Sequence, residues 1–381
     1  MNHLSHRALV GLGCCAVALF GWLTLAAEPS AAQPPSGNGT PTTSPLSGAP
    51  AVALVATIPG DDASRLYVAR PGEPLPPPVL EFRHLPSGSV RAEVWSDDPV
   101  VLATAPTTPS RDPSFDGGLY RLDPAAGAQL LCDGVVHAAR PLITPDGRVF
   151  VARGMAGPSS ANPAAVRVDE LTIDEVDPLT GVVTPVHHHT GHLAHLAGWH
   201  DGRLLVYQVG PGSAEIVAVS PATGKTTVLV ASLPAFARDF SVDPVGGQLV
   251  YRGRHEDDPR RWVVDTLDLA KGARQRLYEG DSFSLAPHVW PGGGVAINPR
   301  RRGLQLLGSG DGLVSPMGSG VDLVRGVSQG DRYVALLHTV QGRLPLPFVV
   351  DRQTSGVAPV PTPPGTRVAV AGFVSAKGGT P

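Results

Sequence analysis

The stretch Val176-Asp177-Pro178-Leu179-Thr180-Gly181 carries the residues of a tight turn between two strands. An Asp side chain can accept hydrogen bonds from the main chain two residues on, Pro presets φ, and Gly takes the positive φ that closes a reverse turn. Apolar residues flank the turn on both sides. The stretch therefore predicts a β-hairpin.

Related stretches recur along the chain, at residues 122–127, 219–224, 267–272 and, with one residue inserted, 350–356. Looser copies lie near residues 88 and 312. The turn glycines are separated by 39, 54, 43, 48, 40 and 44 residues, at Gly88, Gly127, Gly181, Gly224, Gly272, Gly312 and Gly356. A period of about 40–50 residues is typical of the four-stranded blades of a β-propeller.

A second series of turns alternates with the first, at residues 95–98, 144–147, 199–202, 243–247, 290–294 and 328–331. Two hairpins per period make one four-stranded blade. We therefore predict an all-β chain that forms a β-propeller of seven four-stranded blades, with six and eight as alternatives. The blades are expected at residues 51–94, 95–134, 138–190, 193–232, 237–280, 284–318 and 321–360. Residues 361–376 are expected to pair with the N-terminal blade and close the ring.

Composition agrees with an all-β domain. No long window has apolar residues at helical spacing, and 45 Gly and 40 Pro residues interrupt the chain every few positions. The hydrophobic fraction of 42% is ordinary for a folded protein, so these interruptions do not indicate disorder.

The N-terminal region predicts export. Residues 1–27 contain a short polar segment followed by an uncharged apolar run, which indicates a signal peptide or, as an alternative, an uncleaved membrane anchor. Lipid attachment at Cys14 is a third alternative. Residues 28–50 are expected to be a flexible linker rich in Pro, Ser, Thr and Gly, residues 51–376 the propeller, and residues 377–381 a disordered tail. The expected location is periplasmic or extracellular, with membrane contact only through residues 8–27.

Two motifs support a family-level resemblance. Pro145-Asp146-Gly147 before a short strand, and Asp177-Pro178-Leu179-Thr180-Gly181 in the next hairpin, resemble the repeats of exported bacterial propellers of the TolB-like and YVTN quinoprotein-like superfamily. The resemblance covers roughly residues 51–375. It implies a propeller fold, and because the motifs are turn chemistry it implies little about activity.

Histidine is the compositional anomaly, with six of the 13 between residues 187 and 200. His192, His195 and His200 are the candidate metal ligands, because neutral imidazole binds transition metals. Completing a site would require histidines of other blades, such as His255, His288 or His338. The alternative is a polar connection between two blades, since consecutive residues of a strand face opposite ways. We expect no cofactor, with a transition metal as the alternative.

Other classes of chemistry find little support. Motifs of hydrolases, calcium loops and phosphate-binding loops are absent from the sequence. Cys132 lies in a strand pattern that favours buried packing over nucleophilic catalysis. The net charge of −3 and the short run at residues 300–302 argue against a nucleic-acid partner.

Trp95, Trp199 and Trp290 occupy equivalent turn positions and are the candidates for one binding face of the ring. The longest step in the glycine series contains a Gly, Pro, Ser and Ala-rich insertion with Met155 and Ser159. We expect that this insertion cannot extend a blade strand and must project from the ring or fold across it, and that it borders the functional face together with the loop near His195 to His200.

The sequence favours a non-catalytic binding or scaffold propeller of the bacterial cell envelope, with envelope or surface proteins as partners. Two alternatives remain. One is a propeller enzyme, either a metal-dependent lyase or a quinoprotein-like oxidoreductase, and the other is a structural component of a surface complex.

Overall fold

The computed structural model describes residues 46, 48–86, 90–96, 99–107, 117–136, 139–158, 166–190, 193–210, 213–233, 236–243, 247–280, 287–290, 294–297, 305–307, 327–330, 332–338 and 344–374. All of these residues belong to the compact unit Thr40–Pro381. The predicted signal or anchor, most of the predicted linker and the predicted tail lie outside the described residues. Within the described part of the chain, no helix is long and apolar enough to span a membrane.

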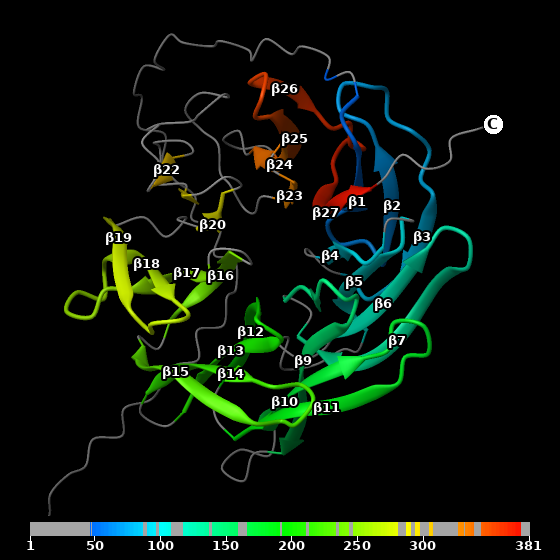
Figure 1. Cartoon of the computed structure of the whole chain (residues 1–381). Helices are drawn as coiled ribbons and strands as arrows, with labels where there is room; N and C mark the ends of the chain where they lie inside the picture. Colours follow the sequence, from blue (N-terminus) through cyan, green and yellow to red (C-terminus); the bar gives the residue numbers. More distant parts are fainter. Residues whose placement is uncertain are drawn as a thin grey trace, which may run out of the picture. The chain divides into compact units, whose positions relative to one another are not determined.

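The described secondary structure consists of strands, which confirms the all-β prediction. In Figure 1 the strands are grouped into successive sheets, here called units 1 to 7 in ring order. Unit 1 contains β27 (Arg367–Val374), β1 (Ala51–Thr57), β2 (Ala63–Ala69) and β3 (Leu80–Arg83). Unit 2 contains β4 (Arg91–Val94), β5 (Val101–Pro106), β6 (Gly117–Asp123) and β7 (Gly127–Val135). Unit 3 contains β8 (Leu142–Ile143), β9 (Val149–Pro158), β10 (Val166–Val176) and β11 (Val183–His189).

The remaining units continue the same pattern. Unit 4 contains β12 (Leu193–His200), β13 (Arg203–Val209), β14 (Ala214–Val219) and β15 (Thr226–Leu233). Unit 5 contains β16 (Arg238–Asp243), β17 (Gln248–Arg254), β18 (Trp262–Asp268) and β19 (Arg274–Gly280). Unit 6 contains β20 (His288–Val289), β21 (Val295–Ile297) and β22 (Gln305–Leu307), and unit 7 contains β23 (Val327–Gln329), β24 (Tyr333–His338), β25 (Leu346–Asp351) and β26 (Gly356–Pro359).

Every described strand pair is antiparallel, and each unit is a meander from its innermost strand outward. Units 2 and 3 form one eight-stranded sheet, because a single residue pair, Val135 with Arg153, joins β7 to β9. The C-terminal strand β27 pairs with β1 along its whole length, from Ala51 opposite Val374 to Thr57 opposite Arg367. The prediction that the C-terminal strand closes the ring on the N-terminal blade is therefore confirmed.

Apolar packing between consecutive units holds the ring together. Strands such as β1, buried at all seven positions, have apolar residues on both faces because each sheet is covered by a neighbour on each side. Seven clusters of buried apolar residues each contain residues of two neighbouring units. For units 1/2, 2/3, 3/4, 4/5, 5/6, 6/7 and 7/1 the clusters include Val55 and Val101, Leu119 and Val151, Phe150 and Val206, Tyr207 and Tyr251, Val264 and Ile297, Ala296 and Val350, and Val349 and Leu54. This closed series supports seven blades, and the number stays a prediction.

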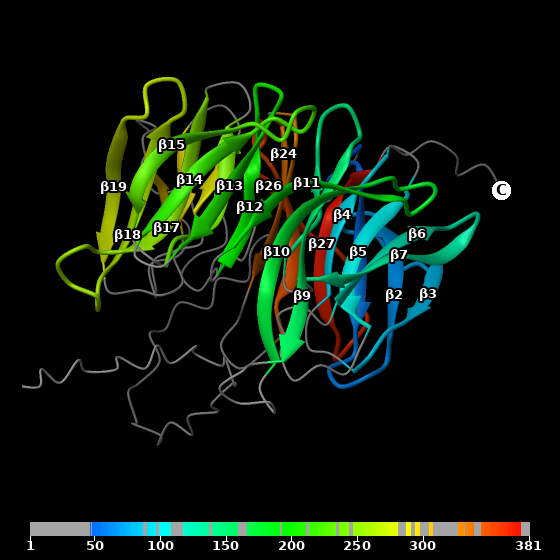
Figure 2. The ribbon, with the colours of Figure 1, turned by 90° about the horizontal axis from the view of Figure 1, so that it is seen from below.

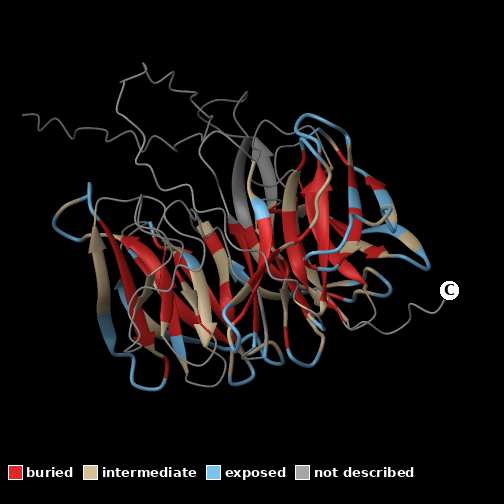
Figure 3. Cartoon of the chain, turned by 90° about the horizontal axis from the view of Figure 1, so that it is seen from above, coloured by how far each residue is buried: buried red, intermediate tan, exposed pale blue. Residues whose placement is uncertain are grey.

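The turn motif has the geometry expected from its residues. The Asp177 carboxylate accepts hydrogen bonds from the main-chain nitrogens of Leu179 (2.8 Å) and Thr180 (3.1 Å), and Gly181 donates to the Asp177 carbonyl (2.8 Å). These main-chain bonds lower the pKa of Asp177. Asp123, Asp268 and Asp351 accept equivalent bonds in other units. Figure 3 shows exposed segments at the connections on both ends of the strands and buried segments along the strands.

Candidate functional site

Each sheet has two ends. The end at which the innermost strand begins is called the loop end, and the β1–β2 and β9–β10 connections also lie there. The opposite end is called the turn end, and it carries the hairpins of the Asp177 type. Figure 2 shows the β1–β2 connection and the far ends of β9 and β10 on the same side of the sheets. Longer connections gather at the loop end, so this is where a ligand-binding site is expected.

The secondary structure of the insertion near residue 155 differs from the one that the sequence predicted. Residues 154–158 continue strand β9 and pair with β10, ending with Pro158 opposite Val166. The expectation that this segment cannot extend a strand is wrong, because the long partner strand β10 supplies main-chain hydrogen bonds and a register shift between Val168 and Glu170 accommodates the irregular sequence. Met155 lies at the loop end of β9 opposite Glu170, and Ser159 lies outside the described residues.

The three candidate metal ligands are not brought together. His195 lies in the loop-end half of β12 opposite Tyr207, and His200 lies at its turn end opposite Arg203. At about 3.3 Å per residue, five residues of strand separate them by roughly 16 Å, too far for one ion. His192 is outside the described residues. Among the residues that the structure describes, no group of three His, Cys, Asp or Glu side chains is placed to hold a metal.

Neighbouring histidines connect two units. His187 on β11 lies 3.0 Å from the Gln208 Oε1 of β13, and Gln208 donates from Nε2 to Glu215 (2.6 Å). Because the Gln208 oxygen must accept, His187 donates from Nε2. His189 reaches the Val209 carbonyl (3.2 Å). These contacts correspond to the alternative interpretation of the cluster as a polar connection between two blades.

Histidines of other units also have local partners. His255 Nδ1 accepts from the main-chain nitrogens of Asp257 (3.1 Å) and Asp258 (3.3 Å), and His288 Nδ1 lies 3.2 Å from the Ser241 hydroxyl. Cys132 is buried, and this burial raises its pKa to about 11. The thiolate needed for nucleophilic chemistry is therefore scarce near neutral pH, and the prediction that Cys132 is buried is confirmed.

The three tryptophans pack between sheets at the turn end. Trp95 donates from Nε1 to the Gly147 carbonyl (2.9 Å), which belongs to the next unit. Trp199 stacks on Phe150 with ring centroids 6.1 Å apart, and Trp290 is only 5% exposed. Much of their aromatic area is therefore used in contacts between units, at the end of the sheets opposite to Met155 and His195.

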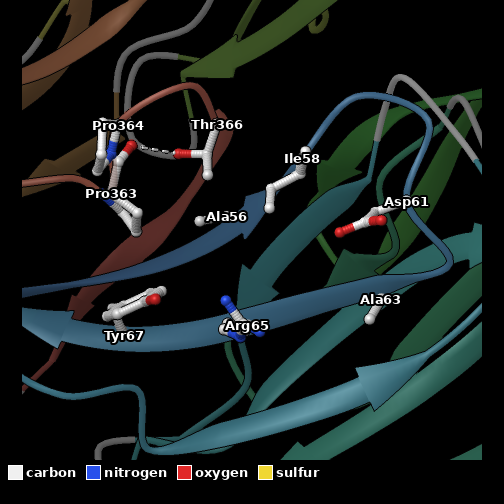
Figure 4. Close-up of a pocket in the computed structure, with 9 residues that line it drawn as sticks. All are labelled: Ala56, Ile58, Asp61, Ala63, Arg65, Tyr67, Pro363, Pro364 and Thr366. Carbon is white, nitrogen blue, oxygen red and sulfur yellow. Dashed lines mark hydrogen bonds between the residues drawn. The ribbon is translucent and has the colours of Figure 1, made fainter.

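A hollow of about 240 Å³ lies at the loop end of unit 1, where the ring closes. We call it the seam pocket, and Figure 4 shows its lining. Its residues come from the end of β1, the β1–β2 turn, one face of β2 and the segment before β27: Ala56, Ile58, Asp61, Ala63, Arg65, Tyr67, Pro363, Pro364 and Thr366. Residues near 58 and near 364 are adjacent because β27 pairs with β1.

The seam pocket has apolar and charged walls. Ile58 is 45% exposed and, with the two prolines, supplies apolar surface. Arg65 donates to Glu81 (2.8 Å), and this bond, with a further contribution from Tyr67, raises the pKa of Arg65. Thr366 donates to the Pro363 carbonyl (2.8 Å), which holds the proline segment in place.

A buried hydrogen-bonded chain lies on the other face of β2, and sequence reasoning missed it. Thr57 and Ser64 hydroxyls are 2.6 Å apart, Ser64 is 2.7 Å from His84 Nε2, and His84 Nδ1 is 2.7 Å from the Leu85 carbonyl. Since a carbonyl only accepts, neutral His84 donates from Nδ1, and Ser64 therefore donates to Nε2. Ser64 is 1% exposed and faces away from the seam pocket, so the chain stabilises unit 1. The pairing of β1 with β2 sets Thr57 opposite Ser64, and the pairing of β2 with β3 brings His84 near them.

Acidification is expected to destabilise the protein through the buried His84 and the partly buried His187 and His195. Burial, with a smaller contribution from Arg238, lowers the pKa of His195 to about 4, and burial also lowers the pKa of His84 and His187. Between the unfolded value of about 6.5 and the folded value, the unfolded chain binds protons that the folded chain does not. The folded state therefore has its full stability with respect to these histidines above about pH 6.5, and it loses stability as the pH falls below that value. For His195 the loss reaches up to about 3 kcal/mol near pH 4. Urea unfolding from pH 5 to 8 should show a shallower pH dependence in His195→Gln, and equal slopes would contradict this assignment.

Comparison with known proteins supports the fold. No family model and no curated protein matches this chain. TolB from Acinetobacter baumannii is 15% identical over 85% of this chain and 67% of that chain, with a TM-score of 0.50. Oligogalacturonate lyase in complex with manganese is 12% identical over 78% of this chain and 83% of that chain, with a TM-score of 0.51. A prolyl endopeptidase, of which the chain spans 50%, is 17% identical over 84% of this chain with a TM-score of 0.52. At these identities the similarity concerns the fold, and the chain is a TolB-like β-propeller in that sense.

Proposed function

We propose that this chain is an exported, non-catalytic binding propeller of the bacterial cell envelope, which engages a partner protein at its loop end. The seam pocket is the observation that carries the proposal. It combines exposed apolar surface at Ile58 with an acidic and a basic side chain, at the end of the sheets where connections are longest. Its volume of about 240 Å³ suits one side chain of a protein better than a typical small-molecule ligand, whose pockets span about 300–1,000 Å³.

Two further features support the location and the class of partner. The sequence of residues 1–27 predicts export, and the fold is similar to that of TolB. The fold is also similar to that of a manganese-bound lyase and of a peptidase, so a propeller enzyme is the alternative proposal. Metal analysis of protein purified without a His-tag separates these alternatives, because a stoichiometric transition metal would favour the lyase.

Site-specific photo-crosslinking in the native host tests the binding function. A photoreactive residue at position 58 is expected to form a crosslink to another protein in the exported fraction. The same residue at position 179, exposed at the turn end, serves as the matched control and is expected to form none. Equal crosslinking at both positions, or none at position 58, would contradict the proposal. Retention of the full-length protein in the cytoplasm would contradict the export part alone.

A further inference from the structure

We propose that the seam pocket is a subsite for one cationic side chain, a lysine in the simplest case, of the partner protein. This inference rests on the proposed binding function, because the partner supplies the side chain. Three features of the pocket carry it: the charge balance around the β1–β2 turn, the apolar walls, and the volume.

The charge balance leaves one carboxylate available. Arg83 donates to both carboxylate oxygens of Asp62, each at 2.9 Å, and Arg65 is paired with Glu81 at 2.8 Å. Asp61 is exposed and takes part in no ion pair among the described residues of this unit. In Figure 4 its carboxylate points toward the space bordered by Ile58 and Arg65. A cation placed there would meet an unpaired negative charge.

The walls suit the stem of a lysine side chain. Ala56, Ile58 and the two prolines offer apolar contact to the methylene groups, while the ammonium group stays near Asp61 at the open side. Tyr67 also lines the pocket but is only 5% exposed, so most of the surface offered to the stem comes from the other residues. The volume of about 240 Å³ limits the occupant to one side chain.

An anionic occupant is the competing interpretation, because Arg65 also lines the pocket. Glu81 already neutralises Arg65, and the resulting bond raises the pKa of the guanidinium. An incoming carboxylate would compete with Glu81 and would lie near Asp61 and Asp62. The same pocket can therefore accept a cation without involving an existing ion pair, whereas an anion would have to share Arg65 with Glu81.

Capped tripeptides provide the test, with full-length protein and ligand-observed NMR at low salt. Acetyl-Gly-Lys-Gly-amide is compared with the norleucine and glutamate analogues, which differ only in the end of the central side chain. We expect millimolar binding of the lysine peptide and weaker binding of both analogues. In Asp61→Asn the lysine peptide should lose about fivefold in affinity, the size expected for one exposed ion pair. In the control Asp201→Asn, which removes an exposed carboxylate at the turn end, its affinity should be unchanged.

Three outcomes would overturn the inference. They are equal affinity for the lysine and norleucine peptides, tighter binding of the glutamate peptide, and no binding at 10 mM peptide, which is about the weakest binding the method detects. Asp61 is an exposed turn residue, and thermal unfolding of both variants checks that they fold. The outcomes also distinguish the two proposals. Crosslinking at position 58 without preference for lysine would leave the binding function standing and remove the cationic subsite. Lysine-selective binding without any crosslinked partner would remove the binding function.

Discussion

Replacing Arg153 with alanine is expected to destabilise the protein by about 3–5 kcal/mol, because it removes the partner of a buried carboxylate. Arg153 on β9 donates from Nη1 to Asp174 (2.9 Å) and from Nε to the Asp133 carbonyl (2.7 Å). The Asp174 side chain is 2% exposed, and its Oδ1 has no hydrogen-bond partner among the residues that the structure describes. Without Arg153 this carboxylate would be buried with no compensating charge or hydrogen bond.

Urea unfolding at pH 7.5 measures the effect, and Arg83→Ala is the matched control. Arg83 also pairs with an aspartate, Asp62, through its Nη1, but its side chain is 72% exposed. Its loss should cost at most about 1 kcal/mol. The double variant Arg153→Met with Asp174→Leu should recover most of the loss, because no charge remains buried. An Arg153→Ala loss as small as that of Arg83→Ala would show that Asp174 does not depend on its arginine.

Replacing Gly181 with alanine is expected to cost about 2–4 kcal/mol, from backbone strain and a close contact together. Gly181 has a φ of +75°, and a Cβ atom added there would lie 2.9 Å from the Leu131 carbonyl oxygen of the preceding unit. That oxygen belongs to the main chain of β7, so neither partner can move without disturbing a sheet.

Gly127 offers the matched control within the same motif. Its φ is +95°, and a Cβ atom there would meet nothing within 4 Å. Gly127→Ala should therefore show the backbone strain alone, about 1 kcal/mol. Comparing the two variants by urea unfolding isolates the contact between units. Equal losses of stability in the two variants would contradict the close contact between the turn of unit 3 and the main chain of unit 2.

The contacts within each turn could be read from the sequence. The bonds from Asp177 to Leu179 and Thr180 span two and three residues, so their geometry follows from the side chains present at those positions. Repetition of that local chemistry at intervals of about 40–50 residues predicted the strand hairpins, the all-β class and the propeller. Ring closure by the C-terminal strand followed because an alternating strand left over at the end requires a partner edge.

The roles of the candidate site residues depended on contacts between distant parts of the chain. His187 is part of a histidine-rich segment in the sequence, and only the structure shows that its partner is Gln208 on the next sheet. Trp95 reads as a surface aromatic until its indole is seen to bind Gly147, 52 residues away. Sequence periodicity shows which residues lie on one strand, but it does not show which face meets a neighbouring sheet.

The seam pocket is the clearest case of a feature that only the tertiary structure decided. Ile58 and Pro363 lie near opposite ends of the domain in sequence, and neither belongs to a motif that predicts binding. They line one hollow because β27 pairs with β1 in one particular register. Turn chemistry acts over a few neighbouring residues and is therefore written in the local sequence. The pocket results from long-range strand pairing and packing, whose register depends on the whole set of apolar contacts between the sheets.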